Sequence, residues 1–97
     1  MKPVQVHPKA KVEISGAFDW YWERSESAAL SFDVELREAF GALRQSPRAC
    51  APYLRGTRRA MVNRFPYFVV FRELARKIQI VAIAHAKRKP AYWANRL

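Results

Sequence analysis

Four residues in the second half of the chain could together perform chemistry: Arg64, His85, Arg88 and Tyr92. Cleavage of RNA by its own 2′-hydroxyl needs a base, an acid, and cations that neutralise the pentacoordinate phosphate, and it needs no metal. His85 could be the base or the acid near neutral pH. Arg64 and Arg88 could hold phosphate oxygens in bidentate forks, and Tyr92 could stack on a base or move a proton.

Further cations and aromatic side chains in the same half could bind a substrate without reacting with it. They are Arg58, Arg59, Lys87, Lys89, Trp93 and Arg96. Aromatic rings serve as stacking platforms for extended RNA. Structural roles are the alternative: paired arginines protect a strand edge from aggregation, a histidine at a strand end is more often structural, and Tyr92 with Trp93 could fold back over the sheet.

Recognised catalytic and cofactor motifs are missing from the sequence. It has no Gly-rich phosphate loop, no His-Glu-x-x-His and no Gly-x-Ser-x-Gly. A single cysteine cannot form an internal disulfide, and two histidines add too few ligands for a four-ligand zinc site. We therefore expect no metal, no cofactor and a reducing cytoplasm as the location. Because the N-terminus lacks an apolar signal core and no stretch approaches about 18 uncharged apolar residues, we also expect no membrane association.

The positive charge is concentrated in the second half of the chain. The formal net charge is +10. Residues 1–45 carry seven acids and six bases, whereas residues 46–97 carry twelve bases and a single acid, Glu73. So uneven a charge attracts polyanions, either nucleic acids or acidic protein segments, although it could also serve solubility alone.

The first half of the sequence predicts a helical hairpin over residues 8–45. Alternating apolar residues indicate a short strand at Val4 and Val6, which ends at Pro8. From residue 8 to about residue 24, apolar residues recur every three or four positions, as on an amphipathic helix. Ser27 is a suitable cap for a second helix that runs to about residue 45. Two helices with so short a link should lie antiparallel.

The second half predicts strands joined by tight turns over residues 52–86, followed by a basic, aromatic tail at 87–97. We expect strands at residues 53–59, turning at Gly56, and at residues 60–65, 67–71 and 78–84. The last two are nearly all apolar and should be central in the sheet. Antiparallel order then places Arg64 near His85 and Arg88, and Arg58 at the opposite end of the sheet.

The predicted fold class is α+β, in the order β-α-α-β-β-β(-β), with the hairpin packed on a small, mainly antiparallel sheet. A chain of 97 residues is expected to form one domain over residues 1–97.

The order and spacing of these features resemble the RelE/ParE superfamily of bacterial toxins from type II toxin–antitoxin modules. The segments that carry the resemblance are Ala17-Phe18-Asp19-Trp20-Tyr21, Phe32-x-x-Glu35-Leu36-x-x-Ala39-Phe40-x-x-Leu43 ending at Ser46-Pro47, Arg58-Arg59-x-x-x-x-Arg64-Phe65-Pro66-Tyr67, and Ile83-Ala84-His85-x-x-Arg88-x-Pro90-x-Tyr92-Trp93. The resemblance implies growth arrest, and a cognate antitoxin that wraps the toxin with an acidic or amphipathic segment.

The resemblance implies two possible targets. RelE-like toxins cut messenger RNA, commonly at the ribosome, and the run Lys87-Arg88 followed by Tyr92 resembles them. ParE-like toxins poison DNA gyrase, and the long helical hairpin with a last strand ending at His85 resembles them. We therefore carry three hypotheses: a metal-independent mRNA endonuclease, which is our first hypothesis; a non-enzymatic gyrase poison; and a basic binding module without toxicity.

Overall fold

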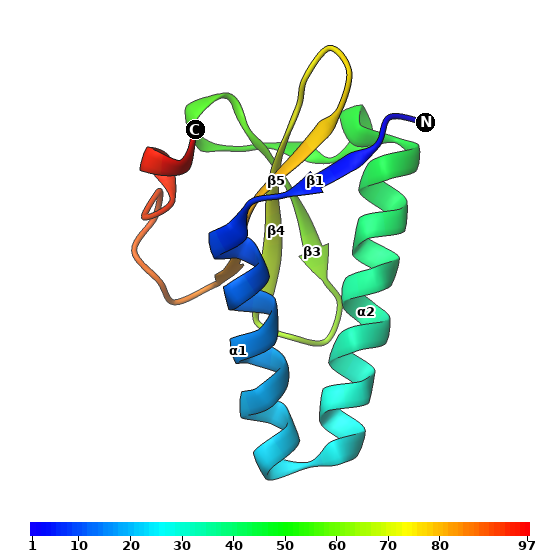
Figure 1. Ribbon diagram of the computed structural model, residues 1–97, viewed down its shortest axis with the longest axis vertical. Coiled ribbons are helices and arrows are strands. Elements are labelled where there is room, and N and C mark those ends of the chain that lie inside the picture. Colours follow the sequence, from blue (N-terminus) through cyan, green and yellow to red (C-terminus); the bar gives the residue numbers. More distant parts are fainter.

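The computed structural model describes residues 1–97 as two long helices and one five-stranded sheet (Figure 1). The elements in chain order are β1 (Val4–Val6), α1 (Pro8–Arg24), α2 (Glu26–Gln45), β2 (Ala51–Pro52), β3 (Arg58–Val62), β4 (Tyr67–Glu73) and β5 (Ile78–His85), with 3₁₀ turns at Pro47–Ala49, Leu54–Gly56 and Ala94–Arg96. The predicted α+β class and element order are confirmed. Neither helix is both long enough and apolar enough to cross a membrane.

The two apolar strands occupy the middle of the sheet, as predicted. The strand order is β1-β5-β4-β3-β2, with β1 parallel to β5 and all other pairs antiparallel. Val62 pairs with Tyr67, and Tyr67 pairs with His85. The ends of β3 and β5 therefore lie at the same end of the sheet.

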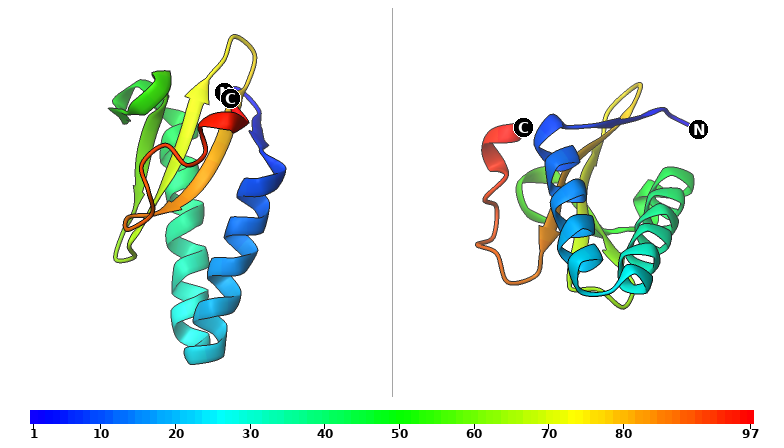
Figure 2. Two further views of the ribbon diagram at one scale, coloured as in Figure 1. Left: turned by 90° about the vertical axis from the view of Figure 1, so that its left-hand side faces the viewer. Right: turned by 60° about the horizontal axis from the view of Figure 1, so that its bottom comes forward.

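The helices form an antiparallel hairpin that covers one face of the sheet and projects beyond its end (Figures 1 and 2). The predicted Ser27 cap is wrong, because Ser25 is the residue between the helices and its Oγ accepts a hydrogen bond from the Ala28 backbone N–H at 3.2 Å. Ser25 has extended backbone angles that end α1 and also begin α2. A single residue therefore makes the link, and Ser27 lies inside α2.

The predicted strands at residues 53–59 and 60–65 are also partly wrong. Arg55 and Gly56 have φ values of 59° and 73°, so the predicted turn at Gly56 is present, but residues 54–56 form a 3₁₀ turn where an extended strand was predicted. The buried Thr57 hydroxyl donates to the Leu54 carbonyl at 2.6 Å and fixes this turn. β3 consequently starts at Arg58, and it ends at Val62 before another left-handed residue, Arg64, at φ 68°. Gly56 predicted the first turn, but positive φ at arginine is uncommon, so the residue types did not predict the left-handed conformations of Arg55 and Arg64.

Two apolar clusters hold the sheet, one on each face. The larger lies under the helices and includes Phe32, Leu43 and Phe71. The smaller lies on the other face, where Trp93 of the tail covers Phe68 and Val70. The tail leaves β5, turns back, and runs along the face of the sheet that the helices leave open, with its end beside the start of α1 (Figure 2). It therefore supplies the cover that a second layer of helices supplies in other folds.

Candidate functional site

A β-bulge in β5 determines where His85 points. Val70 pairs with Ala82 and Phe71 pairs with Ile80, so Val81 has no partner in β4. An extra residue reverses the alternation of side chains beyond it. Ile80 and Ile83 therefore both face the helices, and His85, two residues later, faces α1 as well. Without the bulge, His85 would share the face of the sheet that the tail covers.

An open groove runs between α1 and the His85 end of the sheet, and we call it the α1 groove. Two adjoining hollows of about 350 Å³ and about 210 Å³ form it. Gly16 and Ala17 of α1 line both hollows, because their small side chains leave the space open. The other lining residues are Trp20, Tyr21, Pro66, Tyr67 and His85 in the first hollow and Glu13, Tyr67, Ile83, His85 and Arg88 in the second.

His85 offers a hydrogen-bond donor to the α1 groove. Its ring packs edge-on against Tyr67 at 5.0 Å between centroids. Its Nδ1 accepts a hydrogen bond from the Lys87 backbone N–H at 3.0 Å. Because Nδ1 is the acceptor, the proton of the neutral ring lies on Nε2. Burial raises the pKa of the Tyr67 and Tyr21 hydroxyls, so these groups also remain neutral donors.

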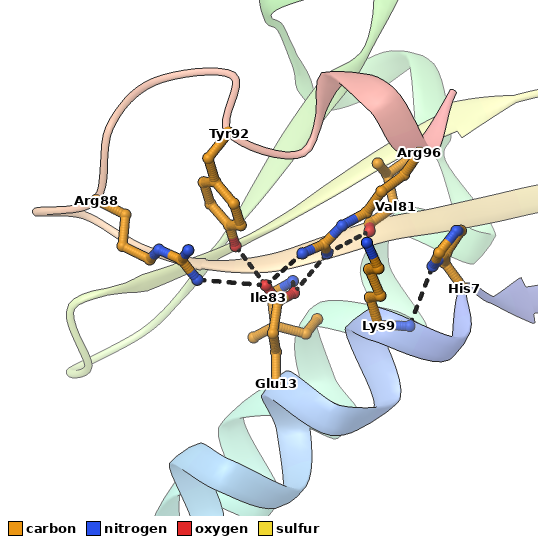
Figure 3. Close-up of polar contacts among 8 residues, drawn as sticks. All are labelled: His7, Lys9, Glu13, Val81, Ile83, Arg88, Tyr92 and Arg96. Atoms are coloured by element: carbon orange, nitrogen blue, oxygen red, sulfur yellow. Dashed lines mark hydrogen bonds and ion pairs between the residues drawn. The ribbon is translucent and has the colours of Figure 1, made fainter.

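Glu13 of α1 is the centre of a polar cluster that holds the tail (Figure 3). Arg96 donates two hydrogen bonds to its carboxylate, at 2.9 and 3.0 Å, and Tyr92 donates a third at 2.7 Å. The backbone N–H of Ile83 donates a fourth at 3.0 Å. Ile83 lies beyond the residues of β5 that pair with β1. The Arg88 guanidinium lies 3.7 Å from the same carboxylate. One acid thus joins α1, β5 and the tail.

The Glu13 cluster changes the chemistry of the tail side chains. Burial, and then the hydrogen bond to Glu13, raise the pKa of the Tyr92 hydroxyl. The same carboxylate, by hydrogen bonding, raises the pKa of the Arg96 guanidinium, which also donates to the Val81 carbonyl at 3.1 Å. Arg88 stacks over the Tyr92 ring with 3.7 Å to its centroid. The side chains of Arg88, Tyr92 and Arg96 are therefore already engaged in contacts with other residues of the protein.

The structure brings some of the four predicted reactive residues together and separates others. His85 and Arg88 line the same hollow, and Tyr92 contacts Arg88. Arg64 does not line the α1 groove, because its guanidinium pairs with Glu35 of α2 at 3.1 Å. The predicted convergence of Arg64 with the other three is therefore not seen.

The six predicted substrate-binding residues fall into three groups that lie in different places. Lys87 and Lys89 are exposed, and they flank Arg88, which lines the second hollow of the α1 groove. Trp93 is only 1% exposed and the Arg96 side chain 9%, so neither presents a free face to a substrate in this structure. At the opposite end of the sheet, Arg58 donates to the Cys50 carbonyl and Arg59 stacks over Tyr53 and Phe68.

Sequence reasoning missed Glu13, although its position carried a signal. Glu13 follows the buried Ala10 by three residues and precedes the buried Ala17 by four, so it lies on the inward face of α1. Acids are almost never buried without a partner. A lone acid on an apolar helix face therefore predicts a partner cation, and the cation-rich tail is the obvious source.

Comparison with known proteins gives one family and a similar fold. Residues 4–90 match the family model described as "ParE toxin of type II toxin-antitoxin system, parDE". A solved structure described as "Chromosomal ParDE TA system from P. aeruginosa" has a similar fold, with a TM-score of 0.76 and 24% sequence identity over 88% of this chain and 96% of that chain. No curated protein matches the sequence significantly.

Proposed function

Because the chain belongs to the ParE family of toxins from type II toxin–antitoxin systems, we propose that it arrests growth by binding DNA gyrase and that a cognate antitoxin neutralises it. ParE-like toxins poison gyrase, whereas RelE-like members of the wider superfamily cut messenger RNA. The observation that supports the gyrase target is the position of Glu13 between the cations that RNA cleavage would need. The proposed target places the activity in the cytoplasm.

The Glu13 carboxylate opposes binding of a phosphate between His85 and Arg88. All three residues line the same hollow, so a phosphate there would lie close to a second negative charge. Two like charges about 4 Å apart repel by about 4 kcal/mol near a protein surface. Arg96 weakens this repulsion only in part, and it cannot hold the phosphate itself, because its donors are already bound to Glu13 and to a backbone carbonyl.

The candidate acid and base also lack the arrangement that RNA cleavage requires. A general base must present a lone pair to the 2′-hydroxyl. The Nδ1 lone pair of His85 is occupied by the Lys87 N–H, and Nε2 carries the proton. The Tyr92 hydroxyl donates to Glu13, and its raised pKa makes it a poor acid. These contacts favour binding over catalysis.

The rim of the α1 groove has the composition of a protein-binding surface. Trp20 is 52% exposed, and the exposed cations Lys87 and Lys89 lie at the same end of the sheet as His85. Tryptophan and arginine dominate the binding energy of protein interfaces, and flanking charges steer the encounter. We propose that this rim contacts gyrase.

A supercoiling assay beside an RNA-cleavage assay tests the proposal. The purified chain should inhibit supercoiling by gyrase or cause cleaved DNA complexes to accumulate, and messenger RNA should remain intact with or without translating ribosomes. Trp20→Ala should weaken the inhibition by about tenfold or more. Val34→Ala, which truncates an equally exposed side chain on α2, is the matched control and should have no effect.

Two results would contradict the gyrase proposal. One is supercoiling that continues unchanged in excess toxin. The other is metal-independent cleavage of messenger RNA that His85→Ala abolishes in a folded protein, since this result would identify the chain as a nuclease.

A further inference from the structure

Besides Arg58 and Arg59, six further cations lie at the end of the sheet opposite His85, and we call the surface formed by these six the basic end. They are contributed by the N-terminus, the end of α2, the following 3₁₀ turn and the hairpin between β4 and β5, all at the top of Figure 1. The residues are Lys2, Arg44, Arg48, Arg72, Arg76 and Lys77. None of them was assigned a role by the sequence motifs, and none lines the α1 groove.

Glu73 is the single acid among these segments, and it pairs with two of the six cations. Glu73 accepts a hydrogen bond from Lys2 Nζ at 3.0 Å and one from Arg48 Nε at 3.4 Å. The hydrogen bonds from these cations lower the pKa of Glu73, so it stays ionised. Six cations and one acid leave an excess of five positive charges among these residues.

Neutral oxygens hold three of the other head groups in position. Arg44 Nε donates to the Lys2 carbonyl at 3.1 Å, and Arg72 Nε donates to the Gln79 side chain at 2.7 Å. Lys77 Nζ donates to the Gln5 side chain. A neutral acceptor orients a cation without cancelling its charge. These three head groups are therefore oriented before any partner binds, which reduces the entropy that binding must overcome.

The composition of the basic end matches the backbone of duplex nucleic acid. The segments that carry the six cations, residues 1–3, 44–48 and 72–77, contain no aromatic residue. Of the nine large apolar side chains that are exposed, five lie on the helical hairpin, and only Met1 adjoins one of these cations in sequence. Protein interfaces need an apolar or aromatic centre, and single strands need rings for stacking. Four of the cations are arginines, whose fork fits phosphate oxygens.

We infer that the basic end binds the phosphate backbone of double-stranded DNA without reading its sequence. This inference goes beyond the proposed action on gyrase, because it concerns the opposite end of the molecule. It gives the toxin a second contact on a target that itself holds DNA. DNA binding is tested without gyrase, so either proposal can fail while the other survives.

Fluorescence anisotropy of a short, labelled DNA duplex of mixed sequence measures this binding directly. The test variant is Arg44→Gln, Arg48→Gln, Arg76→Gln, which removes three exposed cations of the basic end. The matched control is Lys9→Gln, Lys11→Gln, Arg37→Gln, which removes three exposed cations of the helices. Each variant lowers the net charge from +10 by three, so the two proteins carry the same net charge but lose their cations from different surfaces.

The wild type and the control should bind duplex DNA with an affinity that falls steeply with salt. The test variant should bind at least about tenfold more weakly, and its salt slope should be lower by about 2.7, since each lost phosphate contact removes about 0.9. Equal weakening in both variants would overturn the inference, because it would mean attraction by net charge alone. Tighter binding of the single strand, or no binding of duplex at physiological salt, would overturn it as well.

Discussion

At the scale of single residues, the tail depends on one carboxylate. Glu13 accepts hydrogen bonds from Arg96, Tyr92 and the Ile83 backbone, and it lies close to Arg88. Arg96 is nearly buried, so a loss of the negative charge would leave an unpaired cation in the interior. The cluster is therefore important for stability in addition to its effect on phosphate binding.

Replacement of Glu13 by glutamine tests this dependence. We expect Glu13→Gln to lower the free energy of unfolding by about 3 kcal/mol, because the partner charge of the buried Arg96 is removed. For a domain of this size that loss lowers Tm by more than about 10 °C. Thermal unfolding followed by circular dichroism measures it. Glu38→Gln, at an exposed position on α2, is the control, and equal melting of the two variants would refute the role given to Glu13.

The raised pKa of the Tyr92 hydroxyl predicts that the stability of the folded protein depends on pH in the alkaline range. Its pKa is raised in the folded protein by burial and by the hydrogen bond to Glu13, so folding favours the protonated form. The stability that it contributes, about 1 kcal/mol for such a hydrogen bond, is fully present below its ordinary pKa of about 10 and is lost as the pH rises further.

Denaturant unfolding of the wild type and Tyr92→Phe over a range of pH measures this effect. The difference in free energy of unfolding should be constant near neutral pH and should shrink above about pH 10. Tyr53→Phe is the control, because the Tyr53 ring packs against the neighbouring Trp93 without joining the Glu13 cluster. A difference that does not change with pH would contradict the assignment.

The sequence did not predict which acidic side chains pair with the arginines of the candidate site. The residue types and strand order correctly brought His85 and Arg88 to one end of the sheet. They did not reveal that Glu13 and Glu35, from the helices, bind the arginines of the predicted site. The local pattern can mark an inward-facing acid such as Glu13 as needing a partner, but the packing of the helices on the sheet decides which arginine it binds.

At the scale of elements, periodicity predicted what is regular and missed what is irregular. The helices and the central strands follow from apolar spacing, and the structure confirms them. The turn at Arg55 and the bulge at Val81 do not, because each depends on one residue with an unusual conformation or pairing. The bulge has the larger consequence, since it moves His85 to the face of α1.

The tail is the element whose role changed most between sequence and structure. Trp93 covers the second face of the sheet, against Phe68 and near Tyr53. We expect Trp93→Ala to lower the free energy of unfolding by about 3 kcal/mol, because it leaves a large cavity in that apolar cluster. Trp22→Ala, which removes an exposed ring stacked on Phe18, should cost less than about 1 kcal/mol. Similar losses in both variants, measured by denaturant unfolding, would show that the tail does not protect the sheet.

At the scale of the whole molecule, the charge is divided in space as well as in sequence. The helical hairpin carries seven of the eight acids, whereas the basic end holds six cations around the remaining acid, Glu73. Like charges held so close repel one another and destabilise the folded state. Proteins often keep such a cost where function needs the charge. A partner anion, or added salt, should relieve it.

Stability at different salt concentrations therefore distinguishes a functional charge cluster from an ordinary surface. We expect Tm of the wild type to rise with ionic strength, because salt screens the repulsion between exposed cations. At low salt, Arg44→Gln, Arg48→Gln, Arg76→Gln should melt about 5 °C above the wild type, since relief of several repulsions at the basic end yields about 1 kcal/mol. At high salt this difference should vanish.

Lys9→Gln, Lys11→Gln, Arg37→Gln, which removes cations from the acidic hairpin, should melt at or below the wild-type temperature at every salt concentration. A test variant that is no more stable than the wild type at low salt would mean that the six cations are too far apart, or too well solvated, to act as one charged surface.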